Sequence, residues 1–196
     1  MKILFKYATR SRPEFFKRGI ESILNNCVNP NFIILVSVDV DDATAVHSVR
    51  EYYTHPAILI VFHTSKNKVD AINRDVELIK DWDICVNMSD DMVFVENNFD
   101  YKIRQQFESL DLCLHLPDGN RNDLITMAII GREYYNRLGY IYNPEYKSLY
   151  CDNEMTDVAK MLGKYKFVNE NLFLHLHPAY NLAPFDKQYQ YTESFN

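Results

Sequence analysis

Four short apolar runs alternate with amphipathic segments over the first 88 residues, and this alternation strongly constrains the fold. We predict that the runs are strands, at Lys2–Tyr7, Phe32–Val38, Ile58–His63 and Ile84–Met88. The segments between them space their apolar residues as helices do, and predict helices at Glu14–Asn25, Ala43–Tyr53 and Asp70–Lys80. Such an alternation predicts an α/β fold with a mostly parallel central sheet and helices on both of its faces.

A polar cluster follows each of the four predicted strands. The clusters are Thr9–Arg12, Asp39–Asp42, Lys66–Lys68 and Ser89–Asp91. Ligands of parallel sheets bind at the carboxyl ends of the strands. We therefore expect the four clusters to contribute to one binding site.

Asp90 and Asp91, here called the aspartate pair, come directly after the predicted strand Ile84–Met88 and Ser89. Two adjacent carboxylates repel each other unless a cation lies between them. Hard oxygen ligands without a nearby thiolate favour Mg²⁺ or Mn²⁺ over zinc. A divalent ion held by one or two carboxylates keeps open positions for a substrate phosphate. The pair thus predicts a metal site that binds a phosphate-containing ligand.

The pattern is less regular after Asp91. We predict strands at 112–116 and 124–130, helices at 132–138 and 152–162, and a short strand at 167–169. His175 and His177 follow, and their spacing puts both side chains on one face of an extended segment. No repeat, low-complexity tract or linker divides the 196 residues, so we expect a single domain.

Charge and missing motifs exclude several classes of protein. The formal net charge of −6 argues against a general nucleic-acid-binding protein, which would carry a basic surface. The first glycine is Gly19, so no glycine-rich loop follows the first predicted strand. Its absence excludes the dinucleotide-binding fingerprint and the phosphate loop of the NTPases. There is also no Gly-x-Ser-x-Gly nucleophile elbow.

The cysteines and the apolar runs bear on the cellular compartment of the protein and on its attachment to a membrane. Cys27, Cys85, Cys113 and Cys151 show no CxxC spacing, and we interpret them as reduced thiols of an intracellular protein. The N-terminal apolar run is too short for a signal peptide, and no run approaches the roughly 20 apolar residues of a membrane span. We therefore expect a cytoplasmic protein without a membrane anchor, although it could act at a membrane surface.

Taken in order, the motifs resemble those of the nucleotide-sugar glycosyltransferases with a GT-A fold, most closely the inverting family 2. The set comprises a Thr-x-x-Arg-Pro-like loop, an Asp ending the second strand, a Lys/Asn turn, the aspartate pair and a late acidic motif. The resemblance extends from Lys2 to about Tyr189. It implies a nucleotide-sugar-binding half at 1–95 and a smaller acceptor-side half at 96–196.

The resemblance implies which residues bind the nucleotide sugar. They are Thr9, Arg10, Arg12 and Asp39, with weaker matches at Lys66, Asn67 and Asn73. Two arginines at a strand end suit a diphosphate, the alternative being a solvated loop. For Asp39 the alternative is a helix cap, a role that Asp41 or Asp42 could also fill.

In the aspartate pair, the resemblance makes Asp91 the direct ligand of Mn²⁺ or Mg²⁺. Asp90 would contact the ribose or the sugar, or bind the metal through water. The family's Asp-x-Asp motif has Ser89 at its first position here. A late histidine returns to the metal in many such enzymes, and we favour His177 over His175, because Pro178 ends the segment there. A purely structural histidine is the alternative.

Residues Tyr150–Glu154 resemble the family's late acidic motif, with Cys151 where Glu often stands. Asp152 would be the catalytic base, and Glu154 is the second candidate. The alternative for Asp152 is a helix N-cap.

Together these residues predict metal-dependent transfer of a sugar from a nucleoside-diphosphate sugar, by default a UDP-sugar, to an acceptor hydroxyl with inversion. The acceptor could be a saccharide, a lipid-linked molecule or a protein. One alternative is a non-catalytic nucleotide-sugar or glycan-binding module on the same fold. A metal-dependent phosphohydrolase ranks lower, because Glu96 and His115 are the nearest further acid and downstream histidine in the sequence.

Overall fold

A computed structural model describes residues 1–187, 189 and 190 of the chain. Its strands are β1 (Ile3–Thr9), β2 (Phe32–Asp39), β3 (Ile58–His63), β4 (Ile84–Met88), β5 (Met92–Phe94), β6 (Cys113–His115), β7 (Ile129–Gly131), β8 (Tyr165–Phe167) and β9 (Phe173–His175). The α-helices are α1 (Pro13–Asn26), α2 (Ala43–Ser48), α3 (Lys68–Asn73), α4 (Phe99–Gln105), α5 (Arg132–Leu138) and α6 (Cys151–Met161). Short 3₁₀ helices are η1 (Val49–Tyr52), η2 (Val76–Leu78) and η3 (Pro178–Tyr180).

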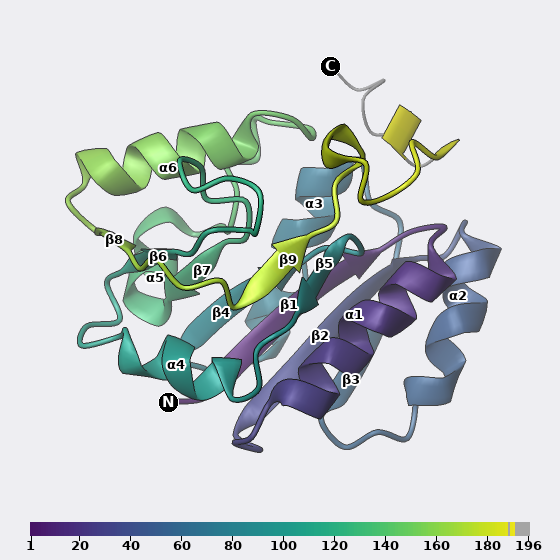
Figure 1. The fold of residues 1–196 in the computed structure, drawn as a ribbon. Coiled ribbons are helices and arrows are strands. Elements are labelled where there is room, and N and C mark those ends of the chain that lie inside the picture. Colours follow the sequence, from purple (N-terminus) through teal and green to yellow (C-terminus); the bar gives the residue numbers. More distant parts are fainter. Residues whose placement is uncertain (188, 191–196) are drawn as a thin grey trace.

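Seven strands form the central sheet, in the order β3-β2-β1-β4-β7-β6-β8 (Figure 1). The first four run parallel, and only β7 runs antiparallel to both of its neighbours. The prediction of a mostly parallel sheet is therefore confirmed. β5 and β9 form a separate antiparallel pair that crosses one face of the central sheet (Figure 1).

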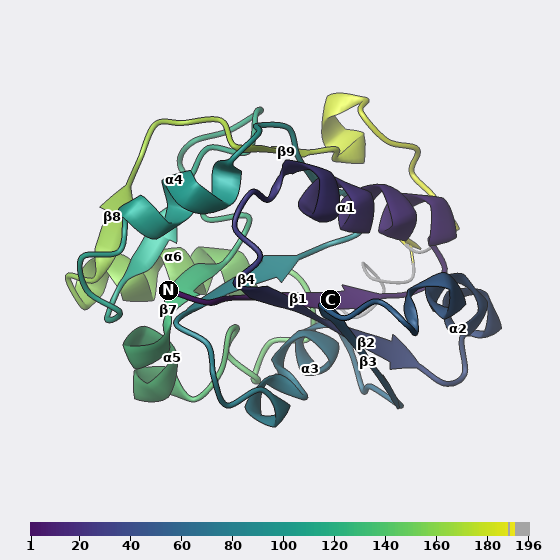
Figure 2. The same ribbon diagram turned by 90° about the horizontal axis from the view of Figure 1, so that it is seen from below.

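Helices cover both faces of the central sheet, as the alternating pattern predicted. Figure 2 shows the sheet nearly edge-on, with α1 and α4 on one side and α3 and α5 on the other. Alternate residues of β1 supply the two cores: Phe5 and Tyr7 pack toward α1, and Leu4 packs toward α3. The ring of Tyr7 meets that of Phe16 on α1 edge-to-face, with 5.1 Å between centroids.

The helix predicted at 70–80 is interrupted. α3 ends at Asn73, Asp75 has a φ of +69°, and a separate 3₁₀ turn, η2, follows. The left-handed residue lets the Asp75 carboxylate accept a hydrogen bond from Ser37 Oγ at 2.8 Å and pair with His63 Nε2 at 2.8 Å. This buried polar network joins three parts of the chain, so tertiary contacts override the local helical pattern.

The second half differs more from the prediction. Helix α4 and strand β5 were not predicted, β9 overlaps the segment expected to be extended around His175, and the strand expected at 124–130 is reduced to β7. β8 lies two residues earlier than the strand expected at 167–169. These elements are short, and partners elsewhere in the chain stabilise them rather than a local pattern.

No helix among the described residues is long and apolar enough to cross a membrane. The four cysteines form no disulfide, and Cys85, Cys113 and Cys151 are buried.

Replacing Gly19 by Ala is expected to destabilise the protein by about 1–3 kcal/mol through overpacking. A Cβ at this position of α1 would lie 2.2 Å from Tyr7 Oη. Helix propensity alone predicts the opposite sign, because Ala is favoured over Gly in helices by about 1 kcal/mol. Urea unfolding would measure the change, with exposed Glu21→Ala in the same helix as the control. A Gly19→Ala variant as stable as wild type would contradict this packing.

Candidate functional site

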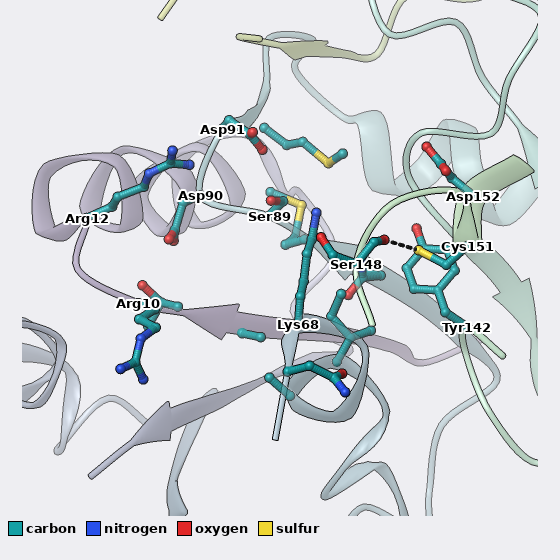
Figure 3. A pocket seen from close by; sticks show the side chains of 18 of the residues that line it. Arg10, Arg12, Lys68, Ser89, Asp90, Asp91, Tyr142, Ser148, Cys151 and Asp152 are labelled. Atoms are coloured by element: carbon teal, nitrogen blue, oxygen red, sulfur yellow. Dashed lines mark hydrogen bonds between the residues drawn. The ribbon is translucent and has the colours of Figure 1, made fainter. Parts of the chain in front are cut away.

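A pocket of about 220 Å³ opens where the carboxyl ends of β1, β2 and β4 meet the start of α6 (Figure 3). Nine of the twelve residues that the sequence predicted for the site line it, namely Thr9, Arg10, Arg12, Asp39, Asn67, Asp90, Asp91, Asp152 and His177. Lys66, Asn73 and Glu154 are not part of its lining. The predicted meeting of polar clusters at the strand ends is thus observed.

The two carboxylates of the aspartate pair point in different directions from the end of β4 (Figure 3). The chain reverses there, because the Ser89 carbonyl accepts a hydrogen bond from Met92 N at 3.0 Å. Asp90 and Asp91 are each only 6% exposed. The Oδ1 atom of each has no hydrogen-bond partner among the described residues. Two acidic oxygens are thus buried at the pocket without a compensating donor.

The environments of the two carboxylates are unlike. Burial raises the pKa of Asp90 to about 7, against the opposing effects of the Thr9 hydroxyl and Arg12. Burial acts in the same direction on Asp91, but His175, Lys68 and Ser89 together outweigh it and hold the pKa of Asp91 well below its ordinary value. Asp91 is therefore the stronger anionic centre of the pair.

His175, on β9, lies between two carboxylates. Its Nε2 is 3.5 Å from Asp91 Oδ2, and its Nδ1 is 3.4 Å from Asp118 Oδ2. Backbone N–H groups of Asn120 and Arg121 each donate to Asp118 Oδ1 at 2.8 Å, which fixes that carboxylate. Burial lowers the pKa of His175, yet the two acids raise it to about 9. At neutral pH the imidazole is therefore a cation facing Asp91.

His177 also lines the pocket, but its role in the fold differs. Its Nδ1 accepts a hydrogen bond from Ala179 N at 3.1 Å and thereby caps η3. Its ring centroid is 5.1 Å from that of His175, and burial together with this charged neighbour lowers the pKa of His177. The structure places His175 rather than His177 beside Asp91, while metal binding by His177 stays a prediction.

The donor set suits a hard divalent cation. The unpartnered oxygens of the aspartate pair are the ligand type that Mg²⁺ and Mn²⁺ prefer. Among the described residues, no three His, Cys, Asp or Glu side chains form a ready metal-binding group. Such a sparse site fits an ion that takes its remaining ligands from water and substrate phosphate.

The two predicted arginines have different surroundings. Arg10 forms a 2.9 Å ion pair with Asp39 and a two-point pair with Asp41 at 2.9 Å, and it points away from the aspartate pair (Figure 3). Arg12 lies on the side of the aspartate pair, where Asp186 binds it through two contacts of 2.8 and 2.6 Å. Arg12 is therefore the better placed of the two to face a diphosphate.

Asp39 and Asp42 divide the roles that the sequence left open at the end of β2. Asp39 lines the pocket, and its Oδ1 accepts from Ser65 N at 2.7 Å. Asp42 caps α2, because its Oδ1 accepts from Thr44 N at 3.1 Å and Ala45 N at 3.2 Å. The cap alternative is thus filled by Asp42 and not by Asp39.

We expect Asp39→Ala to weaken nucleotide binding about 10- to 100-fold, the usual cost of removing a hydrogen bond to a charged group. Asp42→Ala should instead lower the free energy of unfolding by about 0.5–2 kcal/mol, as loss of an N-cap does, with little change in affinity. Calorimetric titration and urea unfolding of both variants would separate the two effects. The reverse pattern would mean that pocket and cap residues have been exchanged.

The third polar cluster contributes differently from the prediction. Lys66 is exposed and outside the pocket lining. Asn67 lines the pocket, while its side chain caps α3. Asn73 binds the backbone of a loop instead: its Oδ1 accepts from Ile141 N and Tyr142 N at 3.0 Å, and its Nδ2 donates to Tyr142 O at 2.6 Å. These bonds occupy the Asn73 amide, so the structure gives it no contact with the pocket.

Asp152 lies across the pocket from the aspartate pair (Figure 3). It is the second residue of α6, and the N-cap position belongs to Tyr150, with a φ of +67°. The N-cap alternative for Asp152 is therefore wrong. Glu154 lies outside the lining, where its Oε1 accepts from Asn143 Nδ2 at 3.1 Å. Of the two acids that the sequence proposed as the base, only Asp152 lines the pocket.

Solved structures with a similar fold include a mannosyltransferase, PcManGT from Pyrobaculum calidifontis, in complex with GDP-Man and Mn²⁺. It shares 13% identity at a TM-score of 0.68, over 86% of this chain and 54% of that one. TarS from S. aureus shares 12% identity at a TM-score of 0.72, over 93% and 38% of the two chains. TarS 1–349 in complex with UDP-GlcNAc shares 13% identity at a TM-score of 0.69, over 88% of this chain and 57% of that one.

The chain has a GT-A fold. This confirms the fold that the ordered motifs predicted. No family model matches the sequence. No curated protein matches it either. The likeness is therefore one of fold, and the chain spans about half the length, or less, of the three structures named.

The GT-A pocket also contains residues that the sequence did not single out. Lys68, at the start of α3, extends toward the aspartate pair (Figure 3) and helps to lower the pKa of Asp91. The polar turn before α3 signalled a contribution there, but not which residue. Asn87, Thr126 and Ser148 line the pocket as well, and no motif marked them.

Proposed function

We propose that this chain is a metal-dependent glycosyltransferase that moves a sugar from a nucleoside-diphosphate sugar to an acceptor hydroxyl with inversion. The observation that carries the proposal is the aspartate pair, buried with unpartnered oxygens in a pocket that extends to Asp152. The GDP-Man, Mn²⁺ and UDP-GlcNAc complexes of structural neighbours support the donor class and the metal. A UDP-sugar is the default donor, and Mn²⁺ or Mg²⁺ the default ion.

Residues at the carboxyl ends of β1, β2 and β4 would bind the donor. Asp39 presents a carboxylate to the nucleotide, and Arg12 adds positive charge on the diphosphate side. Asp91, assisted by Asp90, would hold the divalent ion. When bound, the ion supplies positive charge that stabilises the leaving diphosphate. His175 and Lys68 contribute fixed positive charge around the same carboxylate.

Asp152 would act at the acceptor end of the pocket. Its carboxylate accepts the proton of the attacking hydroxyl as that oxygen bonds to the anomeric carbon. Attack from the side opposite the diphosphate inverts the configuration in a single displacement. Residues 1–95 would thus form the donor side and 96–196 the acceptor side, with His175 of the second half contacting Asp91.

Four unpaired cysteines favour a reducing compartment, so we place the protein in the cytoplasm.

The alternative of a non-catalytic binding module shares the donor site and differs only in lacking turnover.

A thermal-shift screen of UDP- and GDP-sugars, with and without Mn²⁺, tests the proposal. At 100 times its dissociation constant, the true donor should raise Tm by about 5–10 °C for a domain of this size, and only with the metal. Release of the nucleoside diphosphate, UDP or GDP, from the stabilising donor would then distinguish an enzyme from a binding module. A protein that no nucleotide sugar stabilises would contradict the proposed function.

A further inference from the structure

Three uncharged side chains line one wall of the pocket, and nothing in the motifs accounts for them. Asn87 is 3% exposed, Ser148 is 2% exposed and Thr126 is half-buried. Asn87 Oδ1, Thr126 Oγ1 and Ser148 Oγ are all buried and have no hydrogen-bond partner among the described residues. Buried polar atoms are ordinarily paired, so these three indicate a missing partner. We call these three residues the neutral wall.

The fold brings the neutral wall together from distant parts of the chain. Asn87 follows the β4–β7 pairing, and its N–H donates to Ala128 O at 2.8 Å. Thr126 lies in the irregular segment before β7 and lines the same pocket. Asn87 projects on the side of the sheet that α3 covers, because Cys85, two residues earlier on β4, packs in the core on that side.

Two contacts hold Ser148 against that face. The Lys147 carbonyl accepts from Val69 N on α3 at 3.3 Å, and the Ser148 carbonyl accepts from Cys151 Sγ on α6 at 3.0 Å (Figure 3). Asn87 thus lies on a strand of the sheet, and the segment that carries Ser148 is bonded to two helices. Groups held by rigid elements are suited to recognise a ligand of fixed shape.

The position and chemistry of the neutral wall limit what it can bind. Figure 3 shows Ser148 between the aspartate pair and Asp152. In the proposed function the diphosphate lies at the aspartate pair and the acceptor lies at Asp152, so a group that joins the two lies beside Ser148. An amide and two hydroxyls can donate to and accept from neutral hydroxyl groups. None of the three side chains carries a positive charge that could pair with a ligand carboxylate.

We propose that the neutral wall receives the donor sugar and selects an uncharged sugar over a uronic acid. Asn87, Thr126 and Ser148 pair with sugar hydroxyls and make no contact with the nucleotide. This inference rests on the proposed function, because it requires a nucleotide-sugar donor in the pocket. It adds specificity residues that lie outside the recognised motifs.

Calorimetric titration with Mn²⁺ tests the inference, using UDP, UDP-glucose, UDP-glucuronate, GDP and GDP-mannose. Wild type should bind an uncharged sugar nucleotide more tightly than its diphosphate alone, and more tightly than UDP-glucuronate. Sugar-nucleotide binding should weaken about two- to tenfold in each of Asn87→Ala, Thr126→Val and Ser148→Ala. The affinity of each variant for UDP and GDP should be unchanged. Thr126→Ser, which keeps the hydroxyl, should bind as wild type does.

The outcomes separate the inference from the function on which it rests. Equal losses for diphosphate and sugar nucleotide, or no loss for either, would overturn the sugar-binding role and leave the proposed function standing. Preference for UDP-glucuronate would overturn the selection of an uncharged sugar. Wild-type protein that binds none of the five ligands would overturn both. Melting temperatures would check that each variant is folded. The comparison of Thr126→Val with Thr126→Ser is the one least prone to disturb packing.

Discussion

Replacing Asp152 by Asn is expected to slow sugar transfer by about 10²–10⁴-fold, the usual contribution of a positioned general base. Asn is nearly the same size but cannot take a proton from the acceptor hydroxyl. Because Tyr150 and not Asp152 occupies the N-cap position of α6, the substitution leaves the helix start intact. The rate would be measured as release of nucleoside diphosphate from the donor that the thermal-shift screen identifies. Calorimetry should show that the variant binds donor and metal as wild type does.

Glu154→Gln is the matched control on the same helix. Glu154 bonds to Asn143 outside the pocket lining, so this variant should keep its transfer rate. Normal rates for Asp152→Asn together with loss in Glu154→Gln would move the base to Glu154. Normal rates in both would leave neither acid as the base and favour a retaining mechanism, while absence of turnover in wild type would favour a binding module.

Replacing Asp91 by Ala should abolish the metal-dependent part of nucleoside-diphosphate binding, a loss of more than about 100-fold in affinity. Outer-sphere partners of a metal are typically worth 10- to 100-fold, and a direct ligand should exceed that. Asp91 suits this role because it stays ionised, is buried and keeps one oxygen without a donor. Titration of UDP and GDP with and without Mn²⁺ would measure the effect.

Asp123→Ala is the control, since it removes an equal charge from an exposed carboxylate outside the pocket lining. It should leave the metal dependence unchanged. Urea unfolding of Asp91→Ala is needed as well, because that variant also removes one of the two carboxylates beside His175. Equal and metal-independent affinities in wild type and Asp91→Ala would reject the metal assignment.

Much of the donor-side half was predictable because its signals are local. The runs at β1 to β4 are apolar and short, and each is followed by a polar cluster that the parallel sheet brings to one edge. Asp39, Asp90 and Asp91 therefore reached the pocket as expected. Resemblance to the GT-A glycosyltransferases added Asp152, which lies far from the other clusters in the sequence but faces the same pocket.

Side-chain partners were not predictable in this way. Arg10 and Arg12 stand two residues apart in one loop, yet Arg10 pairs with Asp39 and Asp41 while Arg12 pairs with Asp186. All three ion pairs join residues remote in sequence, so no local pattern could assign them. The resemblance likewise implied nucleotide binding by Asn73, whose side chain instead bonds to the backbone of Tyr142.

The sequence by itself determined the parallel sheet, its helical cover and the edge at which polar residues collect. Strand and helix periodicity expresses local burial, and burial drives the assembly of layers. Tertiary structure alone decided that β9 pairs with β5 and so brings His175, not His177, to Asp91. It also decided that Asn87, Thr126 and Ser148 share one wall. Such contacts depend on chain segments many residues apart, whose meeting is set by packing rather than by any local pattern.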